Sequence, residues 1–157
     1  PQGLYFDDEN NFILSTEHGP KGGDEINLIE VDQINKNKIL NYGWPISSYG
    51  EHYVDNQEKY KKYPLHKSHS EYGFIEPLTY FTPSIGISEI VKIRKNKYVA
   101  SSLKYKSLYF FEIDNKKNII NLNKTEVFER VRDLKFYDDK LYLFMEDTAS
   151  IGIISLN

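Results

Sequence analysis

Hydrophobic and polar residues alternate in three similar segments of the chain, and a short polar turn divides each segment in two. The segments are residues 3–16, 87–102 and 131–144. Alternation with a period of two places apolar side chains on one face of a strand, so each segment predicts a β-hairpin. A further short apolar run follows each hairpin, at residues 26–31, 108–113 and 151–156. No segment keeps the 3.6-residue period of an amphipathic helix, so the pattern predicts an all-β, antiparallel protein.

The hairpins recur at a spacing typical of β-propellers. The second runs of the last two hairpins begin at Tyr98 and Leu141, 43 residues apart, which is within the range of propeller blades. The sequence therefore predicts about three antiparallel four-stranded blades. The first spans residues 1–82 with a long insertion, the second spans 83–129, and an incomplete closing blade spans 130–157.

A long segment rich in Lys and Tyr separates the first two hairpins, at residues 32–73. It is either an insertion in a blade or an atypical blade. We favour the insertion, because residues 74–81 supply an outer strand immediately afterwards. Three blades cannot close a ring, and an open arc exposes strand edges and apolar faces. We therefore expect the chain to be a piece of a longer protein, unstable or self-associating alone, and completed by an amino-terminal half.

Composition excludes several classes of partner and site. The formal net charge is −3, and basic residues alternate with acidic ones, so no basic surface for nucleic acid is expected. No apolar run approaches the ~20 residues of a membrane helix. The chain contains no cysteine, which excludes disulfides and thiolate metal sites.

The chemically unusual segments fall on one face of the predicted blades. Antiparallel order sends successive turns to opposite faces. The polar turns at residues 8–11, 94–97 and 138–140 share one face, whereas residues 17–24, 82–86, 104–106 and 129–132 share the other. We therefore expect the backbones of Gly19, Ser84, Lys104 and Arg132 to lie on one face, where a ligand would bind.

The segment from Glu17 to Glu25 combines three glycines with Pro20, a histidine and several carboxylates. Glycine allows the backbone to approach a ligand closely, and proline fixes the direction of neighbouring carbonyls. Carbonyl and carboxylate oxygens suit a hard cation such as Ca²⁺, whereas a single histidine without cysteine argues against zinc. The alternative is an ordinary glycine-rich loop with solvated charges.

Three cations on the same face could bind an anion. Arg130 and Arg132 are two residues apart, so on a strand they project to the same side and could grip carboxylates or phosphates. The alternative is that they pair with Glu129 and Asp133. Lys104 on its own would be read as a solvated lysine. The other histidines, at positions 52, 66 and 69, show no ligand spacing and are expected at the surface.

Five motifs in order resemble the soluble aldose sugar dehydrogenases, also called glucose/sorbosone dehydrogenases. They are His18-Gly-Pro-Lys-Gly-Gly-Asp-Glu-Ile-Asn27, Asn41-Tyr-Gly-Trp-Pro45, Pro83-Ser-Ile85, Ser102-Leu-Lys104 and Arg130-Val-Arg-Asp133. The resemblance spans nearly the whole chain, and the first two motifs are specific. It implies a six-bladed propeller that carries pyrroloquinoline quinone (PQQ) and calcium over its central channel. By length, this chain resembles about the last half of the ring.

The resemblance also implies roles for individual residues. The carbonyls of Gly19 and Pro20 would hold the calcium ion that binds the quinone, and Glu25 with the Tyr42 carbonyl would form a second calcium site. Cofactor contacts would come from His18, Ser84, Lys104, Arg130 and Arg132. Asp24 falls where an acidic residue lies near the catalytic histidine. That histidine belongs to the amino-terminal half in the family, and His18 is not its equivalent, so no catalytic base is expected here.

The sequence leaves three functions open. The first is part of a periplasmic or secreted quinoprotein that oxidises aldoses with PQQ and calcium. The second is a non-catalytic propeller module that binds protein or glycan on the same face. With either function, the chain could form a homo-oligomer. The third is a calcium-dependent hydrolase of propeller type.

Overall fold

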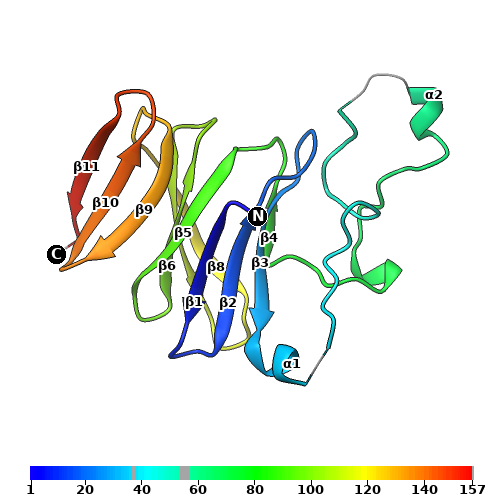
Figure 1. Cartoon of the computed structure of the whole chain (residues 1–157), viewed down its shortest axis with the longest axis horizontal. Coiled ribbons are helices and arrows are strands. Elements are labelled where there is room, and N and C mark those ends of the chain that lie inside the picture. The colour runs from blue at the N-terminus through cyan, green and yellow to red at the C-terminus, as the bar shows by residue number, and fades with distance from the viewer. Residues whose placement is uncertain (37, 54–56, 157) are drawn as a thin grey trace.

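The chain folds into three antiparallel sheets that stand side by side (Figure 1). The computed structural model describes residues 1–36, 38–53 and 57–156. The first sheet contains β1 (Gly3–Asp7), β2 (Phe12–Glu17), β3 (Asp24–Glu30) and β4 (Thr79–Phe81) in that order. The second contains β5 (Ile87–Arg94), β6 (Lys97–Ser102), β7 (Ser107–Ile113) and β8 (Ile119–Glu126). The third contains β9 (Val131–Tyr137), β10 (Lys140–Met145) and β11 (Ser150–Ser155).

The three predicted hairpins are present, with each third strand paired to the hairpin's second strand. The strands differ from the prediction mainly at their ends. The apolar run at residues 26–31 lies in β3, but this strand begins at Asp24, and helix α1 (Val31–Asn35) starts where the strand ends. The predicted outer strand at 74–81 is reduced to the three residues of β4.

Apolar side chains fill the spaces between neighbouring sheets. One cluster joins Phe12, Leu14 and Ile26 of the first sheet to residues of the second, including Tyr98 and Phe111. A second cluster joins the second and third sheets: its members are Val91, Val99, Leu108, Val131, Leu134, Leu141 and Leu143. Full burial of such a side chain contributes about 1.5–3 kcal/mol to folding. The sheets are therefore held together through their faces, while hydrogen bonds hold the strands within each sheet.

A buried polar contact supplements the first apolar cluster. Asp7, at the end of β1, is fully buried and accepts hydrogen bonds from the Tyr98 hydroxyl at 2.5 Å and the Lys92 ammonium at 3.0 Å. Burial alone would raise the pKa of Asp7, but hydrogen bonds from Tyr98, Asn10 and Lys92 outweigh it and hold the pKa below its usual value. The contact fixes the first sheet against the second.

The segment that joins β3 to β4, residues 31–78, is here called the β3–β4 connection. Its described residues contain α1, α2 (Gln57–Tyr60) and the 3₁₀ turn Ser70–Tyr72, but no strand longer than an isolated bridge. It extends beside the first sheet (Figure 1). One bridge attaches it to the β2–β3 loop, where Lys21 pairs with Glu51, and a second bridge, between Ser47 and His66, lies within the connection. No helix in the described parts of the chain has the length and apolar character needed to cross a membrane.

Candidate functional site

Loops that join strands on one edge of the sheets carry most of the predicted site residues. The β2–β3 loop, the β4–β5 connection, the β6–β7 turn and the β8–β9 connection all lie at the upper edge in Figure 1, and the β1–β2 and β5–β6 turns lie at the lower edge. Gly19, Ser84, Lys104 and Arg130 belong to these upper segments, and Arg132 is the second residue of β9. The upper edge is called the rim below.

Glycines allow the β2–β3 loop to pack directly against the β3–β4 connection. Gly23 has a φ of +72°, and a Cβ atom there would overlap the backbone of Gly50. A Cβ atom on Gly19 would overlap the carbonyls of Gly22 and Gly23. Lys21 and Glu51 exchange two backbone hydrogen bonds of 2.9 Å each. Only glycine fits these backbone approaches, which explains the glycine-rich motif in steric terms.

Asp24 ties the β2–β3 loop to the β4–β5 connection. Its fully buried carboxylate accepts hydrogen bonds from the N–H groups of Gly19, at 3.2 Å, and Ile87, at 3.0 Å. It also accepts one from the hydroxyl of Ser84. Beside it, His18 Nε2 donates to the Ile87 carbonyl at 2.6 Å, since a carbonyl oxygen can only accept. Asp24 therefore positions two segments of the rim.

The larger cavity of the rim has a volume of about 620 Å³. Pro20 and Gly22 of the β2–β3 loop, Ser84 and Gly86 of the β4–β5 connection, and Lys104 of the β6–β7 turn all line it. The β3–β4 connection contributes Tyr49, Glu51, Tyr53 and Lys67. These four residues could not be selected from the sequence, because nothing in a Lys- and Tyr-rich segment shows that it folds back over the rim.

Lys104 is held at this cavity by its backbone. The N–H of Leu103 donates to the Gly86 carbonyl at 2.7 Å, and the N–H of Lys104 donates to the Ile85 carbonyl at 3.1 Å. The ammonium group lies 5.8 Å from the centre of the Tyr105 ring. It is not among the ion pairs found in the described residues. Lys104 thus presents an available positive charge.

Arg130 and Arg132 flank the buried Val131 and reach the same carboxylate. Arg130 Nε lies 3.2 Å from Glu146 Oε1, and Arg132 Nη2 lies 2.5 Å from Glu146 Oε2. The expected alternative partners, Glu129 and Asp133, instead accept backbone hydrogen bonds from Thr148 and Leu134. That alternative is therefore wrong, because the β10–β11 turn brings Glu146 across from β9.

The arginines do not line the larger cavity. Consecutive ion pairs nevertheless connect them to the β6–β7 turn, which does line it. Asp147 lies 3.9 Å from Arg130 Nε and 2.7 Å from the Lys106 ammonium. Lys106 belongs to the same turn as Lys104. The third sheet thus brings its cations to the end of the rim where Lys104 lies.

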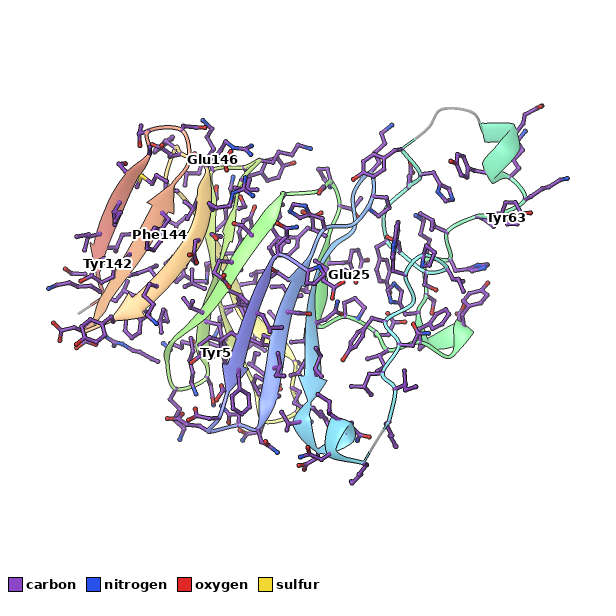
Figure 2. All side chains as sticks on the ribbon, viewed as in Figure 1. Tyr5, Glu25, Tyr63, Tyr142, Phe144 and Glu146 are labelled. Atoms are coloured by element: carbon purple, nitrogen blue, oxygen red, sulfur yellow. The ribbon has the colours of Figure 1, made fainter. Side chains whose placement is uncertain are left out.

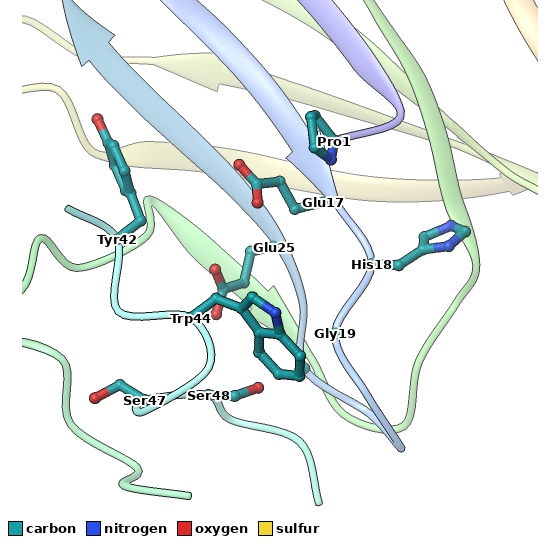
Figure 3. Close-up of a pocket in the computed structure, with 10 residues that line it drawn as sticks. Pro1, Glu17, His18, Gly19, Glu25, Tyr42, Trp44, Ser47 and Ser48 are labelled. Carbon is teal, nitrogen blue, oxygen red and sulfur yellow. The ribbon is translucent and has the colours of Figure 1, made fainter. Parts of the chain in front are cut away.

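A smaller cavity of about 240 Å³ contains four other predicted residues: His18, Gly19, Glu25 and Tyr42. Figure 3 shows the Glu25 carboxylate directed from β3 toward the segment that carries Tyr42 and Trp44. The Tyr42 hydroxyl donates to the Leu28 carbonyl at 2.8 Å, which fixes this segment against β3. The structure therefore brings Glu25 and Tyr42 to one cavity.

Glu25 is buried without a lysine or arginine partner among the described ion pairs. Burial raises its pKa to about 7; the Asn27 amide opposes this shift, and the neighbouring carboxylates Glu17, Glu76 and Asp24 add to it. The nearest ionisable nitrogen is His69 Nε2, 3.5 Å from Glu25 Oε1. The described residues contain no group of three or more His, Cys, Asp or Glu side chains that could hold a metal.

The expected surface position of His69 is wrong. His69 is only 1% exposed, and its ring stacks on Tyr49, which itself stacks on Tyr80. His52 and His66 are half-buried and stack on Tyr60 and Tyr72. The spacing of the histidines along the sequence does not reveal these contacts, because they depend on how the β3–β4 connection folds onto β3 and β4.

Comparison with known proteins decides the family. A model of the family described as glucose / sorbosone dehydrogenase matches residues 1–154. The chain belongs to the glucose/sorbosone dehydrogenase family. It is 30% identical over 141 residues to the uncharacterized protein slr1608 of Synechocystis, covering 85% of this chain and 31% of that protein. It is 27% identical over 165 residues to the aldose sugar dehydrogenase YliI of Escherichia coli, covering 100% and 41%.

Solved structures of dehydrogenases share the fold of this family member. A glucose dehydrogenase crystal structure superposes with a TM-score of 0.76 at 25% identity, covering 98% of this chain and 43% of that one. The PQQ-bound aldose sugar dehydrogenase of Streptomyces coelicolor superposes with a TM-score of 0.63 at 20% identity, covering 97% and 41%. The antiparallel sheets are thus blades of a β-propeller, as predicted. The chain spans less than half the length of the curated relatives it matches.

Proposed function

We propose that this chain supplies cofactor-binding residues to a quinoprotein sugar dehydrogenase that oxidises aldoses with PQQ and calcium. The observation that carries the proposal is the rim cavity of about 620 Å³, which has the size of a small-molecule site. Family membership and the PQQ-bound state of one structural relative support it. A periplasmic or secreted location is part of the proposal.

The cations of the rim fit a cofactor with several carboxylates. Lys104 offers an ammonium group at the cavity without having to break an ion pair with a described residue. Arg130 and Arg132 are paired with Glu146, but all three side chains are partly exposed. Exposed pairs of this kind are worth only about 0–1 kcal/mol, so a cofactor carboxylate can replace Glu146 at little cost. Ser84 adds a hydroxyl at the cavity wall.

The β2–β3 loop fits a calcium ion at Gly19 and Pro20. Their carbonyl oxygens are the hard ligands that calcium prefers. The Gly19 carbonyl accepts one long hydrogen bond of 3.3 Å, from the exposed hydroxyl of Tyr53, and this contact can open readily. When bound at these residues, PQQ would supply a hydride acceptor for the sugar, and calcium would supply a Lewis acid.

In this proposal, the residues of this chain bind and orient the cofactor, and they do not transfer the proton. Asp24 holds the backbone N–H of Gly19 and the hydroxyl of Ser84, so both segments of the cavity wall are fixed together. His18 is fixed in turn by its bond to the Ile87 carbonyl. We assign no catalytic base here, since the proposal places the base in the amino-terminal half.

The second calcium site implied by the resemblance fits less well. Glu25 and Tyr42 share the smaller cavity, but the one ion-pair partner of the Glu25 carboxylate among the described residues is a nitrogen, His69 Nε2 at 3.5 Å. Calcium coordinates oxygen, so this nitrogen does not serve as a calcium ligand. We therefore assign only the Gly19 and Pro20 carbonyls to calcium.

The test is reduction of an artificial electron acceptor by the full-length protein, reconstituted with PQQ and Ca²⁺ and supplied with a panel of aldoses. The proposal predicts aldose-dependent reduction that requires both additions. If none of the aldoses leads to reduction of the acceptor and the protein also binds no PQQ, the proposal is contradicted and a binding module is favoured instead.

A further inference from the structure

Ser88, the second residue of β5, is hydrogen-bonded to strands of all three sheets. Its buried hydroxyl lies 2.6 Å from the Val131 carbonyl of β9 and 2.8 Å from the Ser101 hydroxyl of β6. Its backbone carbonyl accepts a hydrogen bond from the hydroxyl of Thr16 in β2. One residue of the second sheet is therefore bonded to both neighbouring sheets.

The direction of each hydrogen bond in this group follows from the acceptors. A hydroxyl has one hydrogen and a carbonyl oxygen can only accept, so Ser88 donates to the Val131 carbonyl. The Ser101 hydroxyl then donates to the Ser88 oxygen. Thr16 accepts from the Gly3 N–H at 2.8 Å and donates to the Ser88 carbonyl. Replacing Ser88 by alanine would leave the Val131 carbonyl without this donor, in a place from which water is excluded.

Val131 separates the two arginines of the rim. It is fully buried, whereas Arg130 and Arg132 reach the partly exposed Glu146, which Figure 2 shows at the upper end of the third sheet. A cofactor carboxylate that replaces Glu146 removes the contact that holds the arginine side chains. The hydrogen bond from Ser88 is unaffected by this exchange, because it holds the backbone between the arginines.

The residue before Ser88 is bonded to the other side of the rim. The Ile87 N–H donates to the Asp24 carboxylate at 3.0 Å, and the Ile87 carbonyl accepts from His18 Nε2 at 2.6 Å. Two consecutive residues of β5 thus bond to the first sheet and its β2–β3 loop in one direction and to β9 in the other. A shift of β9 against β5 would move the arginines relative to His18 and Asp24.

We propose that Ser88 is a positioning residue for cofactor binding, which sets Arg130 and Arg132 relative to the rest of the rim by fixing Val131. Ser88 is only 2% exposed and does not line the rim cavity, so it acts through the arginines and not by touching the cofactor. Charged contacts contribute most when buried hydrogen bonds behind them fix their geometry. This inference rests on the proposed function, because it requires the arginines to bind PQQ.

The experiment is a PQQ titration of the full-length protein with Ca²⁺, in which Ser88→Ala is made in two backgrounds. In the wild-type background it should weaken PQQ binding by about 3- to 10-fold, as expected for one lost hydrogen bond. With Arg130→Ala and Arg132→Ala already present, it should change the affinity by less than about 2-fold, because the side chains that it positions are absent. A residue that only stabilised the fold would weaken binding equally in both backgrounds.

Ser15→Ala is the matched control, because Ser15 is also a buried serine, but its hydroxyl donates to Glu17 within the same strand. It should leave the affinity for PQQ unchanged. Thermal melting establishes that each variant is folded. If Ser88→Ala does not fold, Ser88→Cys takes its place, since a thiol fills the site but is a weak hydrogen-bond donor.

The outcomes distinguish this inference from the proposed function. Absence of PQQ binding in the wild type, or unchanged affinity when both arginines are replaced, would contradict the proposed function and the role of Ser88 together. If the wild type binds PQQ through the arginines but Ser88→Ala behaves as Ser15→Ala does, only the role of Ser88 is overturned. The same conclusion holds if Ser88→Ala has its full effect in the background without the two arginines.

Discussion

Asp24 and Ile87 are joined by a hydrogen bond of 3.0 Å between the buried carboxylate and a backbone N–H, across 63 residues of sequence. The same carboxylate also holds Gly19 and Ser84, so one side chain fixes two walls of the rim. Asp24→Asn should therefore destabilise the protein by about 1–3 kcal/mol, since an amide cannot accept from all three donors with the strength of a carboxylate. Urea denaturation of the full-length protein measures this loss.

The same substitution should also weaken PQQ binding, because both walls of the cavity lose their common anchor. Asp8→Asn is the control, as Asp8 is exposed in the β1–β2 turn at the opposite edge. Equal effects of the two substitutions on stability and binding would show that Asp24 has no special positioning role.

Substitutions of Arg132 and Glu146 should have opposite effects on cofactor binding. Arg132→Ala removes a charge-assisted hydrogen bond, worth about 1.5–3 kcal/mol, and should weaken PQQ binding by about 10- to 100-fold without unfolding the protein. Glu146→Gln removes the carboxylate that competes for Arg130 and Arg132 and should tighten binding by up to about 5-fold. Fluorescence titration with PQQ compares the variants. Weaker binding in Glu146→Gln would contradict the proposed exchange of partners.

Two glycines with similar backbone angles should respond differently to alanine. Gly23 has a φ of +72° and contacts the Gly50 backbone, whereas Gly73 has a φ of +78° with no atom near its missing side chain. Gly73→Ala should lower the free energy of unfolding by only about 1 kcal/mol, because the positive φ is its only unfavourable feature. Gly23→Ala should cost more and should also impair PQQ binding, because the β2–β3 loop must move. Thermal melting and PQQ titration of both variants test this contrast.

Acid should weaken the junction between the first two sheets through Asp7. Its pKa is lower in the folded chain than in the unfolded chain, where it is about 3.9. The stabilisation is therefore complete above about pH 4 and is lost as the pH falls through the folded pKa. Asp7→Asn should lower the free energy of unfolding by about 3 kcal/mol at pH 7, and this difference from wild type should shrink toward pH 2. Asp138→Asn, in the exposed β9–β10 turn, should show no such pH dependence.

The sequence predicted the hairpins because their alternation has a direct physical cause. Residues such as Leu14 and Leu141 alternate with more exposed ones along strands whose one face packs against a neighbouring sheet. Strand β8 was missed for the same reason: Ile120 and Leu122 are exposed along with its polar residues, so no alternation marks it. A strand that is held mainly by its hydrogen bonds to β7 leaves little hydrophobic pattern.

The candidate site was predictable where local chemistry determines it. The glycines at 19 and 23 and the cations at 104, 130 and 132 stand out by residue type and spacing. Contacts between distant segments were not predictable, because they depend on packing that no local pattern encodes. The pairing of Arg132 with Glu146 and the burial of His69 beside Glu25 are two such contacts.

The rim cavity is proposed to bind PQQ, and a PQQ titration of three full-length proteins in the presence of Ca²⁺ tests this binding. Wild type is compared with Lys104→Ala, at the cavity, and with Lys95→Ala, in the exposed β5–β6 turn at the opposite edge of the same sheet. We expect Lys104→Ala to weaken PQQ binding by about 10-fold or more, because a charged contact is lost, and we expect Lys95→Ala to match wild type. Equal affinity in all three proteins would contradict this proposal.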